Sequence, residues 1–246
     1  MLRVVRLKPL FLVMTFEMEV EVKKKRPILI VTNLLLIATV LIQIYIFLLR
    51  PSDATKIFET YSLSPFNLFR YYRIDNLITY MFLHGSLAHL IVNGIALYAA
   101  GSLVEREVGH LRYLMVFLVS GVIAGLAHCF LNPSSIVPII GSSGAVFGVI
   151  SVLFLLMPFK INFALIIPLP SVIVGIILSV VELSAFWMAQ DVGIAHDAHL
   201  AGFITGGVCS FFIDRKRAVR GLLIAAIVLA VIYYLGVYFG LIPSQS

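Results

Sequence analysis

Two polar residues in this largely apolar sequence are of the types needed for nucleophilic catalysis. Ser143 stands in the run Gly-Ser-Ser-Gly at 141–144, and His199 stands near the start of a later apolar run. A serine hydroxyl attacks poorly unless a base removes its proton, and neutral imidazole has a pKa that suits this task near pH 7. If the fold brings the two side chains together, they could carry out acyl transfer.

The glycines that follow each residue predict how the two could meet. Ser143 precedes a Gly-x-x-x-Gly pattern at 144–148, and His199 precedes another at 202–206. Small residues at this spacing let two membrane helices approach each other backbone to backbone. Packing of the two glycine faces would therefore bring Ser143 and His199 within hydrogen-bond distance, near the outer end of both helices.

Acyl transfer also requires hydrogen-bond donors for the oxyanion that the attack creates. His89 and Asn93 are four residues apart, so they share one face of a helix, whereas His84 is five residues before His89 and points elsewhere. The backbone N–H groups at the start of the helix near Ser143 are further donors. Each role in the reaction therefore has a candidate.

The elements that position these residues are predicted to be membrane-spanning helices. Of 246 residues, 61% are hydrophobic and 12% are charged, whereas a soluble domain carries about 25% charged residues. This composition excludes a soluble enzyme, a nucleic-acid-binding domain and a disulfide-stapled secreted module. The apolar runs that we expect to form helices lie at 27–49, 79–103, 111–131, 145–158, 171–189, 198–213 and 221–241.

The run at 145–158 is too short to cross a membrane by itself. At 1.5 Å per residue it is about 21 Å long, against a hydrocarbon core of about 30 Å. If Lys160 marks its inner end, its outer end starts below the surface, and the preceding segment, 132–142, must enter the protein as irregular backbone. Such backbone is tolerated at membrane depth only where it is buried in protein or lines a wet cavity. A cavity is therefore predicted beside Ser143.

The distribution of positive charges predicts the orientation. All but four of the 18 Lys and Arg residues lie in segments on the side of the N-terminus. By the positive-inside rule we expect a multi-pass protein of the cell membrane, with its N-terminus in the cytosol and its C-terminus outside. The expected regions are a cytosolic tail at 1–26, a helical core at 27–213 with an interfacial first loop at 50–78, and a linker, seventh helix and short outer tail at 214–246.

Taken together, four motifs resemble the signature of the rhomboid family of intramembrane serine proteases. They are His-x4-His-x3-Asn at 84–93, Glu105-Arg106, Gly-x-Ser-Gly at 141–144 and Ala-His-x2-Gly-x3-Gly at 198–206, in the order of the family. The resemblance covers about residues 27–213. It implies an all-α polytopic membrane protein, with a bundle of six core transmembrane helices plus one extra C-terminal helix.

The resemblance also implies an activity and the residues that carry it. The family hydrolyses peptide bonds in or near the outer end of transmembrane segments of its substrates, using a Ser-His dyad in a water-accessible cavity. By this resemblance Ser143 is the nucleophile, His199 is the general base, and His89, Asn93 and the Ser143 amide form the oxyanion hole. The residues expected to pack around this site are His84, Gly141, Gly144, Gly148, Gly202 and Gly206.

The first loop departs from the pattern of the family. A Trp-Arg pair is usual there, and this chain has Asp75-Asn76 in its place. The departure leaves the packing of the loop open and does not affect the chemistry.

Other polar residues near these motifs have no catalytic role in this interpretation. Asp197 lies two residues before His199, so the two side chains diverge on a helix, and Asp197 is expected in a loop or at an N-cap. His196 and His199 have a spacing that could bind a metal, but no acidic partner is expected on the same face. His110 and His128 are interpreted as hydrogen-bonded structural residues. Glu182 is expected to be paired inside the bundle or to lie near a wet crevice, and it is given no role.

Two classes other than proteases are considered. An inactive relative of the family would bind membrane clients without cutting them, and it would typically have lost Ser143 or His199. A transporter with a histidine relay would be expected to have internal repeats, and no convincing repeat is found. The partners expected for a protease are transmembrane substrates and the lipid bilayer, with no nucleic acid, metal or cofactor.

Overall fold

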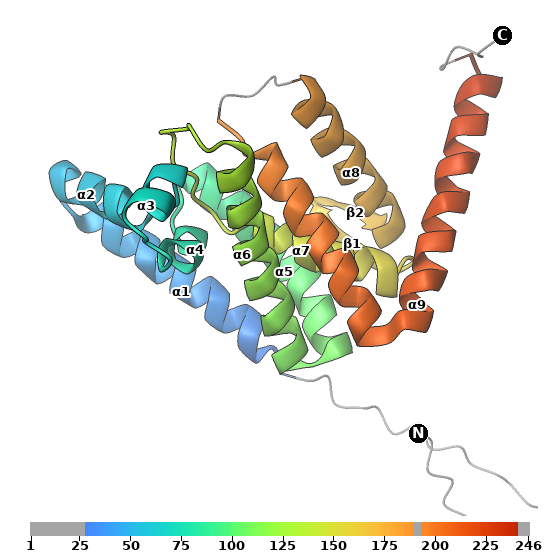
Figure 1. The fold of residues 1–246 in the computed structure, drawn as a ribbon. Coiled ribbons are helices and arrows are strands. Elements are labelled where there is room, and N and C mark those ends of the chain that lie inside the picture. The colour runs from blue at the N-terminus through green and yellow to red at the C-terminus, as the bar shows by residue number, and fades with distance from the viewer. Residues whose placement is uncertain (1–27, 189–192, 241–246) are drawn as a thin grey trace, which may run out of the picture.

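The computed structural model describes residues 28–188 and 193–240, so the predicted tails at 1–26 and 242–246 lie outside the described residues. Figure 1 shows α7 in the middle of the molecule, with α5, α6, α8 and α9 packed around it. The elements follow in the order α1 Ile30–Leu48, α2 Pro51–Tyr61, α3 Pro65–Arg70, α4 Asn76–Thr79, η1 Tyr80–Phe82, α5 Leu87–Val108, α6 His110–Leu131, α7 Ser143–Leu156, β1 Ile161–Leu165, β2 Ile167–Pro170, α8 Ser171–Met188 and α9 His196–Tyr238.

Most of the described chain is helical, and several helices have the length and composition of membrane spans. Among the described residues these are α1, α5, α6, α8 and α9, while α7 is a shorter apolar helix. Most of each apolar run found in the sequence falls in one of these helices, and the last two runs both fall in α9. The expectation of a helical polytopic membrane protein is confirmed, and the six-plus-one arrangement stays a prediction.

The helix that carries His89 and Asn93 begins later than the apolar run at 79–103 suggested. The chain first forms α4 and η1, and α5 then begins after Ser86, whose hydroxyl accepts a hydrogen bond from the His89 N–H (3.1 Å). Ser is a favoured N-cap because its oxygen satisfies an amide that has no partner within the helix. His84 therefore lies in the turn before α5, while His89 and Asn93 lie one turn apart inside it.

The short helix α7 is enclosed by protein on all sides. Twelve of its 14 residues are buried. A helix that is apolar all round is covered either by protein or by lipid, and α7 is covered by protein. Ser143, its first residue, is therefore held at one end of a helix that has little freedom to move.

α9 consists of two arms that meet at Asp214. This residue has φ −154° and ψ 93°, outside the helical range, and Figure 1 shows the chain reversing its direction there. Just after the break, Arg217 Nη2 donates to the carbonyl oxygen of Leu156, the last residue of α7 (2.8 Å), and Nη1 contacts Glu107 (2.6 Å). The first arm of α9 thus runs along the whole length of α7.

The segment at 132–142 is non-helical, as expected, and it is tied to the first loop. Ile139 exchanges two backbone hydrogen bonds with Leu63 (2.7 and 3.1 Å), and the Gly141 N–H donates to the Tyr80 carbonyl (2.9 Å). These bonds satisfy backbone groups that would be costly to leave unpaired in an apolar surrounding. The chain consequently enters α7 from an anchored segment.

The first loop contains the three short helices α2, α3 and α4, with its own packing around Asp75-Asn76. Asn76 is fully buried and donates from Nδ2 to the Ser62 carbonyl (2.6 Å). Arg73 forms an ion pair with Asp75 (Nη2–Oδ2 2.7 Å), and this hydrogen bond lowers the pKa of the Asp75 carboxyl. The loop is therefore held by polar contacts at the position where the family usually has Trp-Arg.

Glu105, from the Glu105-Arg106 pair, holds the start of α1. Its carboxylate accepts hydrogen bonds from the backbone N–H groups of Val31 and Thr32 (2.8 Å each) and lies 2.6 Å from His110 Nδ1. A carboxylate at a helix N-terminus satisfies free amides and complements the helix dipole. The expectation that His110 is a hydrogen-bonded structural residue is confirmed.

A two-stranded antiparallel hairpin, β1 and β2, joins α7 to α8 and was not anticipated from the sequence. Ile161 pairs with Pro170, and Ile166 at the turn has φ +70°. The buried Asn162 donates from Nδ2 to Ser171 Oγ (3.0 Å), which itself donates to the Lys160 carbonyl (2.6 Å). The apolar residues of this hairpin lack the strict alternation that distinguishes a strand from part of a buried helix.

Candidate active site

Ser143 and His199 are in direct contact. His199 Nε2 lies 2.7 Å from Ser143 Oγ, a hydrogen-bond distance, although the two residues are 56 positions apart in the sequence. The imidazole also stacks on the ring of Phe147, with centroids 4.5 Å apart and planes 11° from parallel. Phe147 lies one turn after Ser143 in α7, so it holds the imidazole in the plane from which Nε2 faces the hydroxyl.

The predicted packing of the two glycine faces is present and explains this contact. A β-carbon at Gly202 would overlap the carbonyl oxygen of Gly144, and one at Gly206 would overlap that of Gly148. α7 and α9 therefore meet backbone to backbone along the first arm of α9. No larger residue fits at Gly202 or Gly206 unless the two helices separate.

Gly141 satisfies two requirements at the entry to α7. Its φ of +109° lies in the region that side-chain-bearing residues rarely adopt, and a β-carbon there would stand 2.7 Å from Cε1 and Nε2 of His89. Any other residue would be strained and would displace the His89 ring. The glycine thus allows His89 to lie directly against the turn before Ser143.

The side chain of Asn93 is held by two hydrogen bonds. Asn93 Nδ2 donates to the His89 carbonyl (3.1 Å), and Asn93 Oδ1 accepts from Ser142 Oγ (3.3 Å). An amide nitrogen carries two N–H groups, so the bond to His89 uses one of them. The interaction with Ser142 orients the amide toward the start of α7.

The start of α7 presents backbone N–H groups beside the serine. Ser142 is the N-cap residue, but its side chain makes no capping bond, and the first helical bond of this turn runs from Val146 N–H to the Ser142 carbonyl (2.9 Å). The amides of residues 143–145 precede that bond, and such amides have no partner within a helix. They also lie at the positive end of the helix dipole, where an anion is stabilised.

These groups line one cavity of about 1020 Å³. Ser143, His199, His89, Asn93 and Gly141 all contribute to its wall, together with residues of α8 such as Phe186. The cavity that the short α7 predicted beside Ser143 is therefore present. It is large enough to admit an extended segment of another chain as well as water.

His84 does not contribute to this cavity. It is fully buried, its ring lies edge-on to that of His89 with centroids 4.9 Å apart, and it lines a neighbouring cavity of about 740 Å³ with Asn93 and Ser142. This placement fits the expectation that His84 packs behind the site. The role itself stays a prediction.

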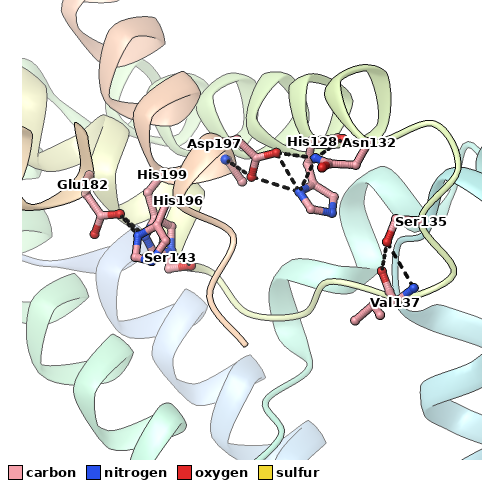
Figure 2. A network of polar contacts seen from close by, with 10 residues as sticks. His128, Asn132, Ser135, Val137, Ser143, Glu182, His196, Asp197 and His199 are labelled. Carbon is pink, nitrogen blue, oxygen red and sulfur yellow. Dashed lines mark hydrogen bonds and ion pairs between the residues drawn. The ribbon is translucent and has the colours of Figure 1, made fainter. Parts of the chain in front are cut away.

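Glu182 lies beside His199, which the sequence analysis did not anticipate. Its Oε2 is 2.6 Å from His196 Nδ1 and 3.1 Å from His199 Nδ1. Figure 2 shows the three side chains close together beside Ser143. The acidic partner of His196 and His199 thus comes from a different helix, α8, and not from their own helix face. The ligand atoms of the three residues lie within 4.8 Å of one another, so this cluster could hold a metal ion.

A second histidine–carboxylate cluster lies on the other side of α9 (Figure 2). Asp197 Oδ1 is 2.9 Å from His128 Nδ1, and Asn132 Nδ2 donates both to Asp197 and to the His128 carbonyl. Asp197 stands in the first turn of α9, after the N-cap residue Ala195, so it is neither a loop nor an N-cap residue. His128 is hydrogen-bonded, as expected, and the cluster joins the end of α6 to the start of α9.

Comparison with known proteins connects this arrangement to one family. The family model described as Rhomboid domain matches residues 69–216, which is more than half of the chain. The match contains all four motifs and begins within the first loop, so it leaves out α1, which the sequence analysis included.

Several curated proteins are similar over part of their length. The chain is 38% identical over 77 residues to Rhomboid protease GluP of Bacillus subtilis, covering 31% of this chain and 15% of that protein. It is 32% identical over 132 residues to Rhomboid-like protease 5 of Toxoplasma gondii, covering 53% and 15%. It is 30% identical over 135 residues to RHOMBOID-like protein 4 of Arabidopsis thaliana, covering 55% and 33%. The chain thus spans a third or less of each of these relatives.

Proposed function

The chain belongs to the rhomboid family, and on that premise we propose that it is an intramembrane serine endopeptidase. The observation that carries the proposal is the 2.7 Å contact between Ser143 Oγ and His199 Nε2 at the wall of a large cavity. Two of the relatives, GluP and Rhomboid-like protease 5, are named as proteases, and this supports the same activity.

In the proposed reaction Ser143 is the nucleophile and His199 is the general base. The Ser143 hydroxyl proton passes to His199 Nε2 while Oγ bonds to the carbonyl carbon of the substrate, whose π electrons move to its oxygen. His199 then gives its proton to the leaving amine nitrogen, and the C–N bond breaks. Water, activated by the same imidazole, hydrolyses the acyl-enzyme and restores both residues.

The oxyanion hole is proposed to consist of His89, Asn93 and the Ser143 amide. These groups line the same cavity wall as Ser143, and the amide stands at the positive end of α7. Donors fixed in place before the reaction stabilise the developing charge more than water does, because they need not reorient. Glycines 141, 144, 148, 202 and 206 are proposed to hold this geometry by allowing the close contacts described above.

We propose that the substrates are transmembrane segments of membrane proteins, cut in or near their outer end. A helix hides its carbonyl groups in its own hydrogen bonds, so a substrate must unwind locally before Ser143 can attack. We further propose six core helices plus a seventh, the second arm of α9, with the N-terminus in the cytosol and the C-terminus outside.

The test is cleavage of a panel of single-span substrates by the purified chain in lipid, with the cut position mapped by mass spectrometry. Ser143→Ala and His199→Ala should each abolish cleavage without loss of fold. Ser151→Ala is the matched control, since Ser151 is a buried serine two turns further along α7. This variant should remain active. Normal turnover by Ser143→Ala would disprove the proposal.

A serine-directed fluorophosphonate probe separates the protease from the two other classes. A protease should be labelled at Ser143, and the label should disappear in Ser143→Ala. An inactive relative or a transporter should show no such labelling in the wild-type chain.

A further inference from the structure

Glu182 is a buried carboxylate in the middle of an apolar helix. It lies in α8, and its side chain is 9% exposed. An ionised carboxylate in such a place is costly unless it is paired, so its partners explain why it is there. Those partners are the two imidazoles of His196 and His199, which α9 brings to α8.

The two contacts of Glu182 differ in geometry. The contact with His196 Nδ1, at 2.6 Å, is a short hydrogen bond that anchors the carboxylate. The contact with His199 Nδ1, at 3.1 Å, is within ion-pair distance but lacks the alignment of a hydrogen bond. Glu182 Oε2 thus lies between the rings, and a small rotation would align it with His199.

The other nitrogen of His199 is the one that faces Ser143 (Nε2–Oγ 2.7 Å). A carboxylate at Nδ1 favours the tautomer with its proton on Nδ1, which leaves Nε2 able to accept the serine proton. The same carboxylate stabilises the imidazolium that forms once Nε2 has taken that proton. Serine, imidazole and carboxylate are therefore in the order of a catalytic triad.

We propose that Glu182 is a positioning residue for His199 and that this chain works with a Ser143–His199–Glu182 triad. The proposal rests on the proposed function, since it has no meaning if Ser143 is not the nucleophile. The carboxylate stays ionised throughout, while the transferred proton moves from Ser143 Oγ to His199 Nε2 and from there to the leaving amine. His196 holds Glu182 through the short hydrogen bond and takes no part in the proton transfer.

The neighbouring carboxylate, Asp197, provides a matched comparison. It is also buried against a histidine and lies within one turn of His199, but its partners are His128 of α6 and Asn132, the C-cap residue of that helix. If any buried carboxylate near His199 were enough, the two residues would have the same effect on catalysis. The proposed triad predicts that, of these two carboxylates, only Glu182 affects kcat.

The experiment compares Glu182→Gln with Asp197→Asn in the full chain in lipid, with kcat, KM and the melting temperature measured for each. Glu182→Gln keeps the shape but removes the charge that strengthens the contact with His199. Its kcat should fall about 10- to 100-fold with KM within about twofold, because the loss concerns proton transfer and not substrate binding. The kcat of Asp197→Asn should stay within about twofold of the wild-type value.

Labelling by the fluorophosphonate and a shorter carboxylate complete the design. The rate of labelling at Ser143 should fall in Glu182→Gln in parallel with kcat. Glu182→Asp keeps the charge but cannot reach both imidazoles, so its kcat should lie between those of wild type and Glu182→Gln. Glu182→Asp also tests the proposal if Glu182→Gln does not fold, since a wild-type kcat in Glu182→Asp would overturn it.

Three further results would overturn it. The first is an unchanged kcat in Glu182→Gln, and the second is an equal fall of kcat in Asp197→Asn. The third is loss of wild-type activity on treatment with the chelator 1,10-phenanthroline, which would assign the Glu182, His196 and His199 cluster to a metal. Cleavage by Ser143→Ala would instead show that the proposed function itself has failed.

Discussion

The helices α8 and α9 are attached to α7 in different ways. α9 meets α7 backbone to backbone, with Gly202 and Gly206 against carbonyl oxygens of α7. α8 meets α7 through a side chain, since the ring of Phe154 lies against Gly175. A backbone contact cannot yield without moving a whole helix, whereas a side chain can change its χ1 rotamer.

This difference separates two requirements of the proposed site. The Ser143–His199 contact joins the two helices that are packed without intervening side chains, so its geometry is set by the backbone. Glu182 reaches His199 from α8, whose attachment is more adaptable. The serine and the imidazole are therefore fixed relative to each other, while the carboxylate can adjust.

The largest expected effect follows from separating α7 and α9. Gly202→Val places its side chain against the Gly144 carbonyl, which cannot move aside, so the helices must shift apart. A displacement of about 1 Å can reduce catalysis by about 100-fold, and we expect at least that loss in cleavage. Full cleavage activity in this variant would disprove the rigid contact.

A smaller effect is expected at the contact between α7 and α8. Gly175→Val overlaps the ring of Phe154, which can move aside only by changing its χ1 rotamer, so we expect destabilisation of about 1–3 kcal/mol and less than a tenfold loss of cleavage. Thermal unfolding and cleavage assays measure the two quantities. The double variant Gly175→Val, Phe154→Leu should recover stability, and failure to do so would show that this contact is not adaptable.

The Asp197 cluster tests whether α9 depends on side chains for its position. Asp197→Asn weakens the contact with His128 and should lower the free energy of unfolding by about 1–3 kcal/mol, since a buried hydrogen-bonding group loses a charged partner. Cleavage should change little, because the glycine contacts still place His199. A parallel loss of stability and of kcat would mean that the glycine contacts alone do not hold the helix.

The smallest effect is expected at Gly207, the neighbour of Gly206. A β-carbon at Gly207 would stand 3.3 Å from Ser151 Oγ, a tight contact with a side chain that can give way. Alanine is a better helix former than glycine by about 0.5–1 kcal/mol, so Gly207→Ala should keep full activity and unchanged or slightly higher stability. A loss as large as that of Gly202→Val would show that glycine content, and not backbone contact, determines the effect.

The relation of Ser143 to His199 could be predicted because its determinants are local. The glycines at 144–148 and 202–206 recur at helical spacing. One pattern begins directly after Ser143, and the other begins three residues after His199. Glu182 could not be placed in the same way, because its contact with His199 depends on how α8 packs against α9. Its one signal in the sequence is a carboxylate within an apolar helix.

Two differences between the predicted and the observed elements, at the start of α5 and at the hairpin, have similar causes. The run at 79–103 is apolar over most of its length, but Ser86 caps α5 and divides the run into a turn and a helix. The hairpin at 161–170 has apolar residues without strict alternation, so hydrophobicity alone did not distinguish it from a connection. In both places hydrogen bonds, and not hydrophobicity, determine where the element begins.

The contact of Arg217 with the last carbonyl of α7 has a consequence for how the two helices can change in length. α9 is attached to both ends of α7. His199 contacts Ser143 at one end, and Arg217 contacts Leu156 at the other. One residue inserted between these attachment points would turn the rest of the helix by about 100°, so the two ends could no longer be matched at once. Insertions or deletions in either stretch should therefore be tolerated only when the partner helix changes by the same number of residues.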